Sequence, residues 1–186
     1  MRYRICFVLV LAVACPVSSA RAGEFVSPEG FTLTFPDDWK LAAQAETGKL
    51  VEAVKKKSRA DPGIVAYIHG TPSEDVTPNI NVIVRKGPIV VNPDFEKAMV
   101  RGLKQGIPKG SPVSQFKTSH FLVRGRALFS VAYETDDARQ KKPLRVWVVM
   151  FPTSGGLCVM TCTALKSQWK EAGAVFKSSI NSLRFE

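Results

Sequence analysis

Histidine and cysteine are scarce in this sequence, which limits the chemistry that its side chains can support. Among 186 residues there are two histidines, His69 and His120, and four cysteines. The acidic residues that could join the histidines around a metal are Asp37, Asp38, Glu74 and Asp75. No pair among them has the close spacing of a structural metal site, and no Ser or Cys has a base beside it that would activate it. We therefore expect no metal site, no cofactor and no enzymatic activity.

These residues have simpler structural roles in the predicted fold. Both histidines fall at the ends of predicted strands, where they are expected to be surface or capping residues. Asp37 and Asp38 are expected to form the N-cap and first turn of a short helix, because a side-chain oxygen at the N-cap accepts hydrogen bonds from the free backbone N–H groups.

A long hydrophobic run is also missing. The apolar segment from Ile5 to Cys15 contains about eleven residues, whereas a helix that spans a bilayer takes about 20. The segment follows the positive residues Arg2 and Arg4 and precedes Pro16. This order is typical of a secretory leader and predicts export of the protein.

The predicted leader ends in small side chains at the positions that signal peptidase requires. Ala20 and Ala22 flank Arg21, so we expect a cleavable signal over residues 1–22, with Gly23 as the new N-terminus and residues 23–186 as a single exported domain. A second possibility is a lipoprotein box at residues 12–15, which would leave a lipidated Cys15. Either route predicts a periplasmic protein with no transmembrane span in the mature chain.

Acidic residues are too few to balance the basic ones. The chain has 26 Lys and Arg against 16 Asp and Glu, a formal net charge of +10, and loss of the three leader arginines would leave +7. The densest run is Lys55, Lys56, Lys57 and Arg59, called the basic segment below. It is predicted to touch an acidic envelope partner or an anionic surface, with a solvated face that aids solubility as the alternative. Export argues against a nucleic-acid partner.

Two cysteines would remain after removal of the leader. Cys158 and Cys162 lie in a predicted strand, where four residues span about 13 Å. A disulfide needs Cα atoms within about 7 Å, so these two cannot bridge each other in a regular strand. We expect both to lie on one face of the strand as small buried apolar residues.

Alternating apolar residues predict that most of the chain forms β-structure. A hairpin is expected from Glu24–Ser27 and Phe31–Phe35, with Pro28-Glu29-Gly30 as its turn. The other predicted strands are 64–68, 80–84, 113–122, 126–135, 144–151 and 157–164. Strand 144–151 is apolar on both faces, which places it inside a sheet. Gly155-Gly156 is expected to be a hairpin turn, because a phosphate loop would need a lysine and a helix after it.

Helices are predicted between the groups of strands. Asn92 and Pro93 are suited to cap and begin a helix that carries Phe95, Met99 and Leu103 at a spacing of four and stops at Gly106 and Pro108. Ser167 is expected to cap a final helix. Its apolar stripe is Trp169, Ala172, Phe176, Ile180 and Leu183. Residues 49–59 are predicted to form a further helix, with a strand as the alternative.

These elements predict an α+β fold, an antiparallel β-sheet of about six strands with helices packed on its faces. Three blocks of sequence also resemble the PsbP/DcrB-like family. They are residues 29–39, where a Gly-Phe strand runs into Pro and Trp, residues 78–84, and the ending from Thr161 through Phe176 to Phe185. The resemblance spans residues 23–186 and implies a sandwich of this kind, in small periplasmic or membrane-extrinsic proteins that are generally non-catalytic and have no motif of active-site residues.

The predicted function is therefore a non-catalytic periplasmic binding or assembly protein that presents a basic surface to an envelope partner. The first alternative is a small-molecule or lipid carrier with a pocket between sheet and helix, lined by Trp147, Phe151 and Met99. The second alternative is a thiol-dependent enzyme that acts through Cys158 or Cys162.

Overall fold

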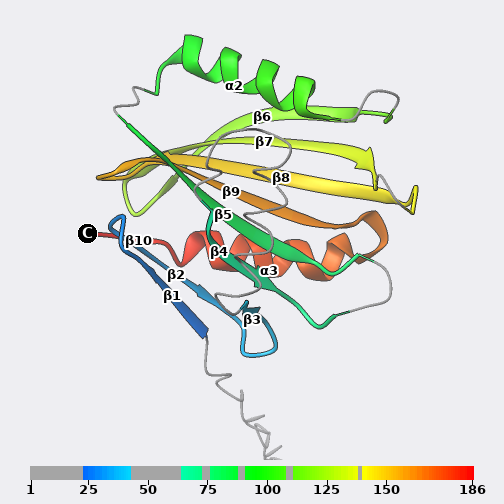
Figure 1. Ribbon diagram of the computed structural model, residues 1–186, viewed down its shortest axis with the longest axis horizontal. Helices are drawn as coiled ribbons and strands as arrows, with labels where there is room; N and C mark the ends of the chain where they lie inside the picture. The colour runs from blue at the N-terminus through cyan, green and yellow to red at the C-terminus, as the bar shows by residue number, and fades with distance from the viewer. Residues whose placement is uncertain (1–22, 43–63, 73–75, 88–90, 108–110, 138–139) are drawn as a thin grey trace, which may run out of the picture.

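The computed structural model describes residues 23–42, 64–72, 76–87, 91–107, 111–137 and 140–186. These residues form two antiparallel sheets and two α-helices (Figure 1). The elements are β1 (Gly23–Ser27), β2 (Phe31–Phe35), β3 (Lys40–Leu41), β4 (Ile64–His69), β5 (Asn79–Lys86), α2 (Pro93–Gly106), β6 (Ser114–Val123), β7 (Arg126–Asp136), β8 (Pro143–Pro152), β9 (Gly156–Leu165), the 3-10 helix η1 (Lys166–Gln168), α3 (Trp169–Asn181) and β10 (Arg184–Phe185).

The larger sheet has seven strands in the order β3-β4-β5-β9-β8-β7-β6. The six strands predicted after the hairpin all belong to it, and the two-residue strand β3 is the seventh. Strand β8 pairs with β7 on one side and β9 on the other. Its residues Val146, Val148, Val149, Met150 and Phe151 are all buried, which confirms the prediction of an inner strand with two apolar faces.

The N-terminal hairpin belongs to a separate three-stranded sheet, with the order β1-β2-β10. Gly30 has φ 79°, the left-handed conformation that its turn requires, and its N–H donates to Ser27 O at 3.2 Å. Phe31, Leu33 and Phe35 are buried on one face of β2, while Thr32 and Thr34 alternate with them. The hairpin was predicted correctly, but the single sheet of about six strands was not, because β10 supplies a second partner for β2.

Helix α3 packs between the two sheets (Figure 1). Its residues Ala172, Phe176 and Ile180 are buried against β2 and β9, and Leu183 follows them into the same core. This arrangement confirms the predicted apolar stripe. The predicted cap is wrong, because Ser167 lies inside η1 and the N-cap residue Gln168 makes no side-chain capping hydrogen bond.

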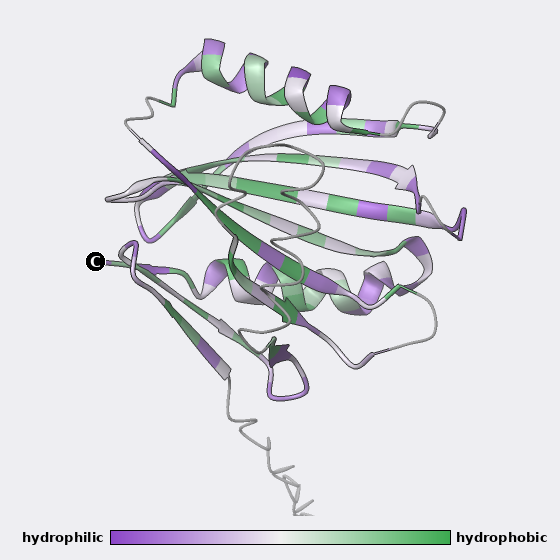
Figure 2. Ribbon diagram, viewed as in Figure 1, coloured by the Kyte–Doolittle hydropathy of each residue, from purple (hydrophilic) through white to green (hydrophobic). Residues whose placement is uncertain are grey.

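Helix α2 lies over the opposite face of the large sheet, beside β6 and β7 (Figure 1). Asn92 Oδ1 accepts a hydrogen bond of 2.8 Å from Phe95 N, as the sequence predicts for an N-cap. Hydrophilic and apolar residues alternate along the helix (Figure 2). The apolar ones, Phe95, Met99, Val100 and Leu103, contact the sheet, yet no residue of α2 is fully buried.

The segment after β2 differs from its prediction. Asp37 and Asp38 occupy a turn rather than a helix start, and Trp39 N donates to Pro36 O at 2.9 Å. The strand β3 follows directly. Trp39 itself returns to the core as predicted, with 6% of its surface exposed, and its ring meets Phe176 edge to face at 5.6 Å.

Candidate functional site

The cysteines and histidines lie on opposite faces of the large sheet. Cys158 and Cys162 are buried on the α3 face, as two unbridged thiols on one side of β9. His69 pairs with Asn79, which pairs with Thr163, and residues directly opposite each other share a face. Thr163 alternates with Cys162, so His69 lies on the face opposite the cysteines.

His120 lies on the α2 face of the sheet. It pairs with Phe129 of the α2-side cluster, and its Nε2 lies 2.8 Å from Glu96 Oε1 of α2. The prediction that both histidines end strands holds for His69 but is wrong for His120, which lies inside β6. Neither histidine shares a face with a cysteine, so no Cys/His pair forms in the described part of the chain.

Burial also makes both thiols unsuitable as nucleophiles. Desolvation raises the pKa of Cys158 and of Cys162 far above the ordinary value of 9.0. A reactive cysteine instead needs an electropositive, partly exposed site that lowers its pKa. Within the described ranges, no group of three or more His, Cys, Asp or Glu side chains could hold a metal ion.

The three residues predicted to line one carrier pocket lie in two different cores. Trp147 and Phe151 point to the α3 face of β8, whereas Met99 packs on the α2 face. The prediction that all three residues line one pocket is therefore wrong. Phe151 is fully buried and contacts the rings of Phe31 and Phe185, each at 5.4 Å, so it is a core residue.

Met99 nevertheless borders a cavity between sheet and helix. The α2 cavity, of about 380 Å³, is lined by Met99, Gly102, Leu103, Gly106, Ile107, Tyr133, Thr135 and Asp136. Met99, Leu103 and Tyr133 give it apolar walls, while Thr135 and Asp136 give it one polar end. Thr135 Oγ1 is buried and has no hydrogen-bond partner among the described residues.

Side-chain contacts also connect α2 to the sheet. His120 meets Glu96 near the start of the helix, and Lys104 Nζ lies 4.9 Å above the Phe116 ring near its end. Phe116 in turn stacks on Tyr133, with ring centres 5.5 Å apart. Burial raises the pKa of Tyr133 above its ordinary value of 10.0, so the phenol that borders the cavity stays neutral over the physiological range.

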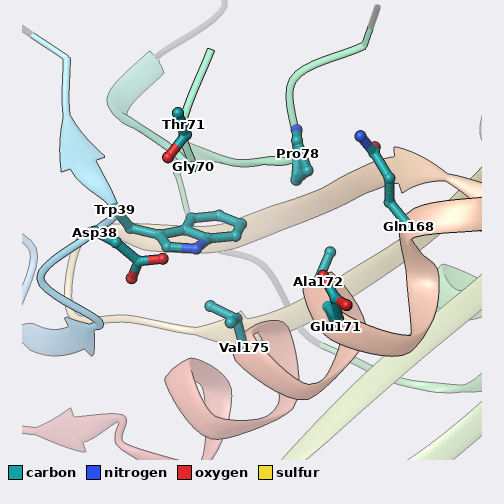
Figure 3. A pocket seen from close by; sticks show the side chains of 9 residues that line it. All are labelled: Asp38, Trp39, Gly70, Thr71, Pro78, Gln168, Glu171, Ala172 and Val175. Carbon is teal, nitrogen blue, oxygen red and sulfur yellow. The ribbon is translucent and has the colours of Figure 1, made fainter. Parts of the chain in front are cut away.

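A second cavity, the Trp39 pocket, lies where α3 begins on the other side of the sheet. It has a volume of about 250 Å³. Its lining residues are Asp38, Trp39, Gly70, Thr71, Pro78, Gln168, Glu171, Ala172 and Val175. Figure 3 shows the Trp39 indole reaching in from the β2–β3 turn, with Asp38 beside it and Glu171 approaching from α3.

Hydrogen bonds and close packing fix the wall behind the Trp39 ring. Gly70 N donates to Pro78 O at 2.9 Å, and the Gly70 carbonyl lies 2.8 Å from His69 Nδ1. A Cβ added at Gly70 would lie 3.4 Å from the indole, an ordinary contact distance. The lining residues come from three separate parts of the sequence: 38–39, Gly70 to Thr71 with Pro78, and 168–175.

Several predicted site residues fall outside the described residues. They are the basic segment Lys55, Lys56, Lys57 and Arg59, the leader residues Cys15, Ala20 and Ala22, the acids Glu74 and Asp75, the predicted helix 49–59, and Pro108. Gly23 is described, and it begins β1 opposite Phe35. A Cβ at Gly23 would overlap the Phe35 ring, so the first residue after the predicted cleavage site packs closely against β2.

Comparison with solved structures defines the fold class. No protein-family model matches the sequence, and no curated protein is similar enough to count as a relative. The structure is similar to cyanobacterial PsbP (CyanoP) from Synechocystis sp. PCC 6803, with a TM-score of 0.62 and 12% identity over 95% of this chain and 99% of that one. It is also similar to LpqN, described as involved in cell envelope biogenesis of Mycobacterium tuberculosis, with a TM-score of 0.55 and 18% identity over 87% and 90% of the two chains. The chain thus has the PsbP-like fold that its three sequence blocks indicated.

In the ranges that the structure describes, no helix combines the length and the apolar character needed to cross a bilayer.

Proposed function

We propose that this chain is a non-catalytic, exported binding protein of the cell envelope, and that it holds a small amphiphile in the α2 cavity. The observation that carries the proposal is the cavity itself. Its volume of about 380 Å³ falls within the range of about 300–1,000 Å³ that is common for small-molecule sites. The predicted leader and the fold shared with an envelope-biogenesis protein support the location.

The lining of the cavity indicates the chemistry of the ligand. Met99, Leu103 and Tyr133 offer carbon surface to an alkyl or aryl body. At the polar end, the Thr135 hydroxyl has no hydrogen-bond partner within the described ranges, and the Asp136 carboxylate can accept hydrogen bonds. Buried polar groups in folded proteins normally have hydrogen-bond partners. These groups therefore suit a ligand with a hydrogen-bond donor at one end, such as a medium-length alcohol or amine.

Native mass spectrometry of freshly purified protein tests this proposal directly, because a carrier is expected to retain its ligand. A titration with N-phenyl-1-naphthylamine, which pairs an aryl body with an N–H donor, gives a second measurement. Gly102→Leu is expected to fill the cavity and abolish the fluorescence increase. Thr135→Val should weaken binding by about fivefold, the equivalent of one hydrogen bond of about 1 kcal/mol.

Thr118→Val provides the matched control. Thr118 is an exposed threonine of the neighbouring strand β6 and does not line the cavity. Its substitution should leave probe binding unchanged. Equal binding by the wild type and Gly102→Leu, together with ligand-free protein in the mass spectrum, would refute the amphiphile site.

The basic segment remains a separate proposal that concerns a protein or surface partner. Four positive charges within five residues would attract an acidic envelope component. Replacing Lys55, Lys56, Lys57 and Arg59 with Ser and comparing co-purification from envelope extracts tests it. Unchanged recovery of partners would reject a role for the segment.

A further inference from the structure

The second half of α2 packs on the sheet less closely than the first half. Four residues of the first half are partly buried, namely Phe95, Glu96, Met99 and Val100. The second half consists of residues 101–106, called the α2 end segment below. The structure describes all six of them, and Leu103 is partly buried while the other five are exposed. The end segment therefore has little packing to hold it in place.

The α2 cavity lies between this end segment and the sheet. Gly102, Leu103 and Gly106 line the cavity from the helix, and Tyr133 lines it from β7. A Cβ added at Gly102 or at Gly106 would meet no atom within 4 Å. Glycine is also a poor helix former, because it loses more backbone freedom than alanine when it is ordered. The end segment thus combines open space on its inner side with a weak helical sequence.

A cation–π contact joins the end segment to the sheet. Lys104 Nζ lies 4.9 Å from the centre of the Phe116 ring of β6. Phe116 stacks on Tyr133, so this contact reaches a wall of the cavity. The first half of α2 has a different attachment, because Glu96 Oε1 lies 2.8 Å from His120 Nε2. Each half of the helix therefore has its own polar link to β6.

We propose that the α2 end segment is a lid that closes over the ligand of the α2 cavity, with the contact between Lys104 and Phe116 as its latch. The lid rests on the function proposed above, because it needs a ligand in that cavity. Segments with few buried apolar contacts open locally at a low cost in free energy, and lids are drawn from such segments. A ligand beside Gly102 would supply the apolar contacts that the end segment lacks, so binding and closure should stabilise each other.

Hydrogen–deuterium exchange measured by mass spectrometry tests the lid, with N-phenyl-1-naphthylamine as the probe. In the ligand-free protein, the amides of residues 101–106 should exchange about tenfold faster than those of residues 97–100. At a probe concentration of about ten times its Kd, exchange of the end segment should slow about tenfold, because a lid that opens must release the probe. The amides of α3, which packs on the other face of the large sheet (Figure 1), should not change.

Lys104→Gln tests the latch. It should speed exchange of the end segment by about two- to fivefold, the equivalent of a cation–π contact of about 0.5–1 kcal/mol. Arg101→Gln is the matched control, because Arg101 is an exposed cation of the same segment that does not line the cavity. It should leave exchange unchanged.

A second variant separates the latch from the helix dipole. Lys104 lies in the last turn of α2, where the dipole also favours a positive charge. In a Phe116→Leu protein the dipole is intact but the ring is gone, so Lys104→Gln should have no further effect there. An equal effect of Lys104→Gln in both backgrounds would reject the latch. Lys104 is exposed, so far-ultraviolet circular dichroism of Lys104→Gln should match that of the wild type.

The remaining outcomes separate the lid from the binding site. Equal exchange of residues 97–100 and 101–106 in the ligand-free protein would overturn the lid, because the end segment would then be as firmly held as the rest of α2. Probe fluorescence that reports binding, without slower exchange of the end segment, would overturn the lid and leave the proposed function in place. Absence of probe binding would count against the α2 cavity as the binding site, and the lid would be rejected with it.

Discussion

The glycine in the middle of α2 offers a direct test of how this helix contributes to stability. Gly102 lines the α2 cavity, and an added methyl group would meet no atom within 4 Å. A glycine inside a helix costs about 0.8–1 kcal/mol relative to alanine. Because no steric clash offsets this gain, Gly102→Ala should raise the free energy of unfolding by about 1 kcal/mol. For a chain of this length, that corresponds to an increase in Tm of about 2–4 °C.

Thermal and urea unfolding followed by circular dichroism at 222 nm measure this change. Gly125→Ala provides a control of opposite sign, because Gly125 has φ 78°, where a Cβ is strained by about 1 kcal/mol or more. A Tm that does not change in Gly102→Ala would mean that α2 unfolds independently of the sheet. A lower Tm would mean that the added methyl group meets other atoms and that the space beside Gly102 is not open. Either result would remove the structural basis of the α2 cavity.

Three other predictions follow from burial. Phe176→Ala should lower the free energy of unfolding by about 3–5 kcal/mol in urea titrations, since Phe176 is fully buried between the two sheets. Cys158 and Cys162 should resist iodoacetamide at pH 8 until the protein is unfolded, because burial raises the pKa of both thiols; rapid labelling of the native protein would contradict this. Burial also raises the pKa of Tyr67 and Tyr133 above 10.0. The contribution of these two phenols to stability is therefore complete below pH 10 and is lost as the pH rises through their raised pKa values. Absorbance at 295 nm should show that tyrosines of the native protein ionise at a higher pH than those of the urea-unfolded protein.

Local signals in the sequence predicted the elements whose shape is set by a few neighbouring residues. The Asn92-Pro93 start of α2 was predicted because capping depends on residues three apart. The inner position of β8 was predicted because both of its faces are apolar. The PsbP-like architecture was found in the same way, from three short blocks in the correct order.

Features that depend on how distant segments meet were missed. The alternation of Phe31, Leu33 and Phe35 is the same whether β2 joins the large sheet or a separate one. Periodicity placed Trp147 and Phe151 on one side of β8, but it could not show that Met99 covers the other side. The Thr135 hydroxyl, which has no hydrogen-bond partner in the part of the chain that the structure describes, likewise gives no sequence signal of its own.

The Trp39 pocket was missed for a similar reason. Asp38 and Glu171 are more than 130 positions apart, so no motif joins them. The available signal was indirect: two acidic residues, one beside a buried tryptophan and one at a helix start, in a chain rich in lysine. A sequence search could find such a pair only if the fold were already known.

The strand β2 pairs with β1 on one side and with β10 on the other. Ser182 Oγ also accepts a 2.8 Å hydrogen bond from Thr34 N, which ties the end of α3 to the same strand. The smaller sheet is therefore complete only when residues 182–185, at least 148 positions further along the chain, have reached β2. Because contacts between segments far apart in the sequence are slow to form, we expect this sheet to be completed late in folding.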